Sequence, residues 1–166
     1  MADLTNIPIL HIIKETVNKV KEKYQDISRI GLLATNEIIK TKIFQKELDK
    51  ISVETILPNE YIMKNYVIKA INNVEIKKTD SRTTNILKRA AHHLTDQGAD
   101  LIMLGCTELP VVFEQKNFDF PVIDPMKVLA KKSIGYVRKI FDKVVPKKSL
   151  FYFILSFNLK FYDENS

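Results

Sequence analysis

The apolar residues of this chain fall into short continuous runs separated by stretches with helical spacing. A short apolar run bounded by Gly, Pro or Asn is typical of a strand buried on both faces of a parallel sheet. Such runs predict strands at residues 7–13, 30–34, 101–104 and 120–124, with a shorter and more polar one at 51–57. His11 lies within the first run, so we expect it to be a core histidine.

The stretches between these runs carry apolar residues three or four positions apart, as amphipathic helices do. They predict helices over residues 15–24, 39–48, 58–72, 79–97 and 125–141. We expect Asn72 and Asn73 to end the third helix, and Gly98 to close the fourth from the C′ position. The alternation of strand and helix predicts an α/β fold with a parallel sheet flanked by helices.

The sequence from Gly105 to Pro110 carries the candidate chemistry, because it contains the single cysteine of the chain. Cys106 follows the apolar run at residues 101–104, where a buried strand is expected to meet a helix N-terminus. Thr107 is expected to cap this helix, with Glu108 in its first turn and Pro110 near its start. Free backbone N–H groups at such a position favour a thiolate, which predicts a reactive thiol. The alternative is a buried structural thiol.

Composition limits the classes of function. A chain of 166 residues is long enough for one domain with its own core. A single cysteine excludes an internal disulfide and a cysteine-based zinc site, and suits the reducing cytoplasm. The net charge of +6 comes from scattered lysines, which indicates a solvated surface and no nucleic-acid site. No metal site and no membrane-spanning segment is predicted.

The C-terminal residues have a different pattern. From 150 to 162 apolar residues occupy alternate positions and many are aromatic, which is strand periodicity with one apolar face. We therefore divide the chain into an α/β lobe at residues 1–145 and an aromatic-rich tail at 146–166.

Several segments resemble the aspartate/glutamate racemase family. The Gly-Cys-Thr-Glu-Leu-Pro sequence at Gly105 is similar to the second catalytic cysteine motif of that family. Further similar segments follow the order of the family's second lobe, at residues 7–13, 30–35, 66–70 and 121–126. The resemblance covers residues 7–142 and leaves out the tail.

The resemblance implies a flavodoxin-like lobe of a two-lobe enzyme that racemises aspartate or glutamate without a cofactor. It implies that Cys106 is an acid/base thiol and that Glu108 supports it. It also implies that Thr107, Lys69 and Thr35 bind a small acidic amino acid.

Two departures from the family pattern bear on activity. The family's first cysteine precedes the segment matching residue 7, and no second cysteine occurs here, so we expect a truncated enzyme that lacks most of its first lobe. Glu37 and Ile38 stand where the family has Gly-Thr, which puts a carboxylate near an anionic substrate. Activity would then need a homo-oligomer or a complementing N-terminal lobe. The alternative is a catalytically inactive truncated domain that self-associates or binds a small acidic ligand.

Overall fold

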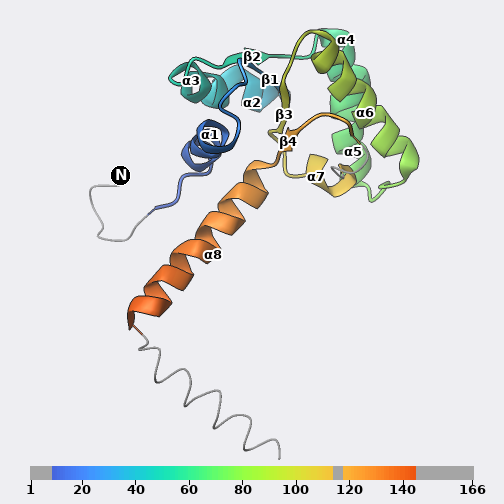
Figure 1. Cartoon of the computed structure of the whole chain (residues 1–166). Coiled ribbons are helices and arrows are strands. Elements are labelled where there is room, and N and C mark those ends of the chain that lie inside the picture. Colours follow the sequence, from blue (N-terminus) through green and yellow to red (C-terminus); the bar gives the residue numbers. More distant parts are fainter. Residues whose placement is uncertain (1–8, 114–117, 145–166) are drawn as a thin grey trace, which may run out of the picture. The chain divides into compact units, whose positions relative to one another are not determined.

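A computed structural model describes residues 9–113 and 118–144, and it contains a four-stranded parallel sheet (Figure 1). The strands lie in the order β2-β1-β3-β4, with bounds Glu54–Ile56, Arg29–Leu33, Leu101–Leu104 and Val122–Ile123 respectively. This arrangement confirms the predicted class, a parallel sheet flanked by helices. The aromatic tail and its predicted boundary at 145/146 lie outside the described residues, so both remain predictions.

The register of the strands fixes which residues meet at the carboxyl edge of the sheet. Leu33 of β1 pairs with Leu104 of β3, and Met103 of β3 pairs with Ile123 of β4. All pairs are parallel, so the strands end at the same edge. In parallel α/β sheets this is the edge at which ligands bind.

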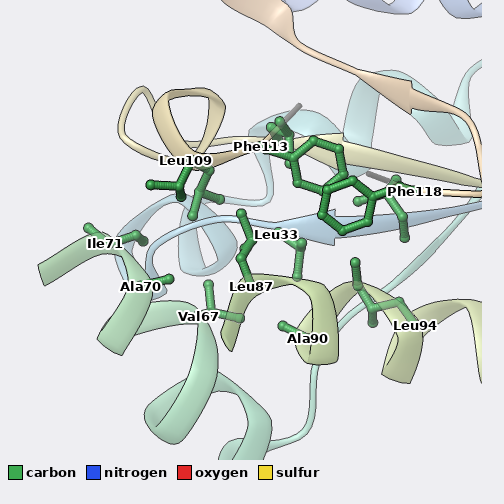
Figure 2. Packing of buried hydrophobic residues seen from close by; sticks show 14 of the residues in the cluster. Leu33, Val67, Ala70, Ile71, Leu87, Ala90, Leu94, Leu109, Phe113 and Phe118 are labelled. Atoms are coloured by element: carbon green, nitrogen blue, oxygen red, sulfur yellow. The ribbon is translucent and has the colours of Figure 1, made fainter. Parts of the chain in front are cut away.

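One face of the sheet is covered by helices from the middle of the chain. These are α4 (Glu60–Ile62), the π-helical segment η2 (Met63–Ile68), α5 (Lys69–Glu75), α6 (Ser81–Asp96) and α7 (Leu109–Val112). Their apolar residues form one buried cluster with Leu33, Ile102 and Leu104 of the strands (Figure 2). Phe113 and Phe118 belong to this cluster and stack with ring centroids 3.7 Å apart.

The opposite face is covered by α1 (Ile12–Lys23) and α3 (Ile43–Asp49), with the short helix α2 (Asn36–Thr41) joining β1 to α3. Ile30 and Leu32 point to this face, whereas Leu33 points to the other, as the period of two in a strand requires. Most residues of both clusters lie in predicted strands and helices, but Phe113 and Phe118 lie outside every predicted element.

The last helix, α8 (Pro125–Val144), begins in the compact unit that contains the sheet. That unit ends at Leu129, and a second unit starts at Ala130. Asp124 caps the helix by accepting hydrogen bonds from the backbone N–H groups of Met126, at 2.9 Å, and Lys127, at 3.2 Å. Among the described helices, none is both long and apolar enough to cross a membrane.

Three local predictions were wrong. The run at residues 7–13 is no strand where it is described, because α1 begins at Ile12, and His11 is an exposed residue at the N-cap of that helix. A short apolar run cannot distinguish a strand from the start of a buried helix. Asn72 and Asn73 do not end their helix, which continues to Glu75. Asn73 is held there by a hydrogen bond from its side-chain amide to the Thr83 hydroxyl, at 3.0 Å.

Candidate functional site

The candidate site lies where β1 and β3 end side by side. The backbone N–H of Gly105 donates to the carbonyl of Leu33 at 2.7 Å, so the pairing of the two strands continues one residue past β3. In the same register, Thr35 after β1 and Cys106 after β3 occupy equivalent positions. These two residues, 71 positions apart in the sequence, therefore lie at the carboxyl edge on neighbouring strands.

Gly105 is required at this point for packing. A Cβ atom on Gly105 would lie 2.9 Å from the Cβ of Ala34 and 2.9 Å from Cδ1 of Leu32. Carbon atoms in contact prefer about 3.5–4.0 Å. The glycine thus lets the turn that carries Cys106 approach β1 closely.

Cys106 is half-buried and packs against the cluster beneath α6 and α7. Its Sγ donates a hydrogen bond to Oε2 of Glu108 at 2.8 Å. Burial and this carboxylate raise the pKa of the thiol to about 11, while the backbone N–H groups of Glu108 and Thr107 act in the opposite direction. The expected thiolate is therefore wrong for this arrangement, in which the sulfur carries a proton at neutral pH.

The helix after Cys106 differs from the prediction as well. α7 begins only at Leu109 and has four residues, and Glu108 is its N-cap without a side-chain capping bond. Thr107 is not the cap, because its hydroxyl donates to Oε2 of Glu108 at 3.1 Å. A helix of one turn also carries little dipole to favour a thiolate. Pro110 does lie in the first turn, as predicted.

Thr35 is engaged in a similar way at the end of β1. Its Oγ1 accepts a hydrogen bond from the backbone N–H of Ile38 at 3.4 Å and so caps α2. The backbone N–H of Glu37 and a hydrogen bond from the Thr35 hydroxyl lower the pKa of the Glu37 carboxyl. At both strand ends, a glutamate of the chain itself engages the threonine hydroxyl that was expected to bind substrate.

Lys69 is exposed at the start of α5, and α5 contacts α7. Within the described residues, no hydrogen bond or ion pair joins Lys69 to Cys106, Thr107 or Thr35. The six residues before Lys69 form the π-helical segment η2, a rare conformation that often occurs at functional sites. This segment could not be predicted from the sequence, because its apolar spacing is that of an ordinary helix.

Asp124 is a residue at this edge that sequence reasoning did not single out. It follows β4 directly and caps α8. An acidic residue between a predicted strand and a proline was the signal available for it. Among the described residues, no three His, Cys, Asp or Glu side chains are grouped so that they could hold a metal ion.

The arrangement can deliver a proton. A partly exposed thiol that is hydrogen-bonded to a carboxylate can act as a general acid, and its conjugate thiolate can act as a base.

Comparison with known proteins shows which family this chain resembles. Residues 1–132 match the Asp/Glu/Hydantoin racemase family. A protein described as the broad specificity amino-acid racemase RacX of Bacillus subtilis is 29% identical over 133 residues, which are 78% of this chain and 55% of the relative.

Solved structures agree with the sequence match. Picrophilus torridus aspartate racemase superposes with a TM-score of 0.66 at 26% identity, over 76% of this chain and 52% of that one. An aspartate racemase homologue from Pyrococcus horikoshii superposes with a TM-score of 0.68 at 20% identity, over 80% and 57%. The chain spans about half the length of these relatives. By sequence and by fold, this chain belongs to the Asp/Glu/hydantoin racemase family.

Proposed function

We propose that this chain performs thiol acid/base chemistry in the cofactor-independent racemisation of an amino acid, with Cys106 as one proton carrier. The observation that carries the proposal is the half-buried thiol of Cys106, hydrogen-bonded to Glu108 at the carboxyl edge of the sheet. The family match over residues 1–132, which includes Cys106, supports it.

The chemistry requires two proton carriers. The α-proton of the amino acid passes to a base on one face of the α-carbon, and an acid returns a proton to the opposite face. Cys106 is the one cysteine of this sequence, so the other carrier has to be a different group. We propose that it comes from a second copy of the chain or from a complementing lobe.

We propose aspartate or glutamate as substrate, bound in the cytoplasm. The substrate carboxylate would be held by Thr107, Thr35 and Lys69, because hydroxyl, backbone N–H and ammonium groups are donors for carboxylates. The name of the Picrophilus torridus enzyme supports an acidic substrate, and that of the Bacillus subtilis relative supports a wider range. In the free chain both threonine hydroxyls contact glutamates, so substrate would have to displace Glu108 and Glu37 from them.

The test is exchange of the α-proton in deuterium oxide, followed by loss of the α-proton signal in NMR spectra. We expect exchange with aspartate or glutamate, and we expect Cys106→Ala to abolish it. Cys106→Ser is the matched control for folding, since it keeps the shape of the side chain and a hydrogen-bond donor for Glu108, while its hydroxyl is too weakly acidic to replace the thiol. If neither aspartate nor glutamate exchanges its α-proton at high protein concentration, the proposal is contradicted.

A second candidate function is a non-catalytic domain that binds a small acidic ligand or self-associates. The single cysteine of the sequence favours it. It predicts chemical-shift changes at Thr35 and Thr107 when aspartate is added, or a concentration-dependent mass in sedimentation, with no exchange of the α-proton.

A further inference from the structure

The part of α8 that belongs to the second compact unit carries exposed apolar side chains. This part starts at Ala130, and its side chains are described as far as Phe141 (Figure 1). Ile134 is 69% exposed and Val137 is 64% exposed, although both are aliphatic. Tyr136, Ile140 and Phe141 are exposed as well. Nearly half of the large hydrophobic residues that are exposed in the described part of the chain lie in this one stretch, which marks it as an interaction surface.

These five residues share one side of the helix. At 3.6 residues per turn, the arc from Tyr136 to Ile134 spans about 160° and includes the other three. The remaining residues within this arc, Ala130 and Ser133, carry no charge. The seam between two paired helices is narrower, because it uses two of every seven positions. A wide apolar face therefore fits a broad apolar surface better than a single helix.

Basic residues border this apolar face on both sides. Lys131 and Arg138 lie along the margin next to Ile134, and Lys132 and Lys139 lie along the margin next to Tyr136. No acidic residue occurs between residues 130 and 141. A second copy of this stretch would bring like charges together, so the margins disfavour pairing of α8 with itself. They are complementary to a surface of negative charge.

We propose that α8 docks onto the surface of a lipid bilayer that contains anionic lipids. The helix lies in the plane of the surface with Ile134, Val137 and Phe141 towards the acyl chains. The basic residues on both margins keep the helix out of the hydrocarbon core, and their long side chains reach the lipid phosphates. Tyr136, at one margin, has the ring with a polar tip that favours the level of the headgroups. This docking is independent of the proposed racemase chemistry.

The test is sedimentation of the full chain with vesicles of phosphatidylcholine that contain about 30 mol% phosphatidylglycerol, compared with vesicles of phosphatidylcholine alone. We expect binding to the anionic vesicles to be at least about tenfold tighter. It should weaken as the salt concentration rises from about 0.1 M to about 1 M, because salt screens the attraction between the helix and the lipids.

Two variants test the two parts of the surface. A basic residue near an anionic bilayer strengthens binding about fivefold, so Lys131→Gln combined with Arg138→Gln should weaken it about twenty-five-fold. Ile134→Gln removes the most exposed apolar side chain of the face, and we expect binding at least about tenfold weaker. All of these side chains are exposed, so circular dichroism should show wild-type folding for each variant.

The matched control for charge is Lys14→Gln combined with Lys21→Gln. These exposed lysines lie seven positions apart on α1, as Lys131 and Arg138 do on α8, but the apolar face of α1 is buried. The control for the apolar change is Ile76→Gln, since Ile76 is 60% exposed at the end of α5. We expect both controls to bind the anionic vesicles as the wild type does.

Three results would overturn the proposal. The first is equal binding to neutral and anionic vesicles, and the second is wild-type binding by the Lys131 and Arg138 variant, because the lipid would then be held by another part of the chain. The third is an absence of vesicle binding. In that case sedimentation velocity shows what covers the apolar face: a concentration-dependent mass that Ile134→Gln abolishes indicates a second copy, and a constant mass leaves an acidic protein as the partner.

Discussion

The close approach of the Cys106 turn to β1 can be tested by Gly105→Ala. The added Cβ would lie 2.9 Å from the Cβ of Ala34 and 2.9 Å from Cδ1 of Leu32. Both distances fall short of ordinary carbon contacts by at least about 0.6 Å. Leu32 can change its side-chain torsion, but the Cβ of Ala34 moves only with the backbone of β1. The turn must therefore move away from β1 and lengthen the 2.7 Å hydrogen bond from Gly105 to Leu33.

Overpacking of this kind costs about 1–3 kcal/mol of the free energy of unfolding. At about 2–4 °C per kcal/mol for a chain of this size, the melting temperature should fall by roughly 2 to 12 °C. Urea and thermal unfolding followed by circular dichroism measure both quantities. A displaced turn should also weaken the hydrogen bond between Cys106 and Glu108, so we expect faster alkylation of the thiol at pH 8.

Gly135→Ala is the matched control, because the same methyl group added to α8 would meet no described atom within 4 Å. Alanine is a better helix former than glycine, so this variant should be more stable by about 0.5–1 kcal/mol. If Gly105→Ala keeps wild-type stability within about 0.5 kcal/mol, the usual range for surface changes, the packing argument for Gly105 is wrong.

Two further predictions concern the sheet and its helices. Leu94 of α6 is fully buried, so Leu94→Ala should lower the free energy of unfolding by about 2–5 kcal/mol. Urea titration measures this loss, and a loss under about 1 kcal/mol would contradict the place of Leu94 in the core. Asp100 accepts hydrogen bonds from the backbone N–H groups of Ser28 and Arg29, both at 2.9 Å, and these hold its pKa below the usual value of an aspartate. A lowered pKa stabilises the fold above the ordinary value, and this contribution disappears as pH falls through the folded value. The difference in free energy of unfolding between the wild type and Asp100→Asn should therefore be constant above about pH 5 and should shrink below about pH 4. If this difference does not depend on pH, the proposed role of the Asp100 charge is refuted.

The sequence predicted the elements whose side chains are buried on every side. The runs at 30–34 and 101–104 became β1 and β3 because continuous apolar residues need cover on both faces of a sheet. Gly98 adopts a φ of +89° after α6, the left-handed conformation for which glycine was expected. The predictions failed where an apolar run was short, as at residues 7–13, or where a tertiary contact extended a helix, as at Asn73.

The sequence predicted where Cys106 and Thr35 lie relative to the strands, whereas their roles in a site remain predictions. Cys106 and Thr35 were expected at strand ends, and the register of β1 and β3 puts them there. The expected thiolate was wrong because the side chain of Glu108 turns back to the sulfur and burial disfavours charge. The spacing of residues in the sequence does not predict which of several nearby acceptors will receive the hydrogen bond of a hydroxyl or thiol.

By itself the sequence determined the alternation of strands and helices after the first helix, the position of the lone cysteine after a buried strand, and the family resemblance. These follow from local apolar spacing and from a contiguous motif. Only the tertiary structure decided that Thr35 and Cys106 follow adjacent strands, that Gly105 is needed for close packing, and that burial and Glu108 raise the pKa of the thiol. Those properties depend on contacts between residues far apart in the chain and on the loss of water around the sulfur, and local pattern encodes neither.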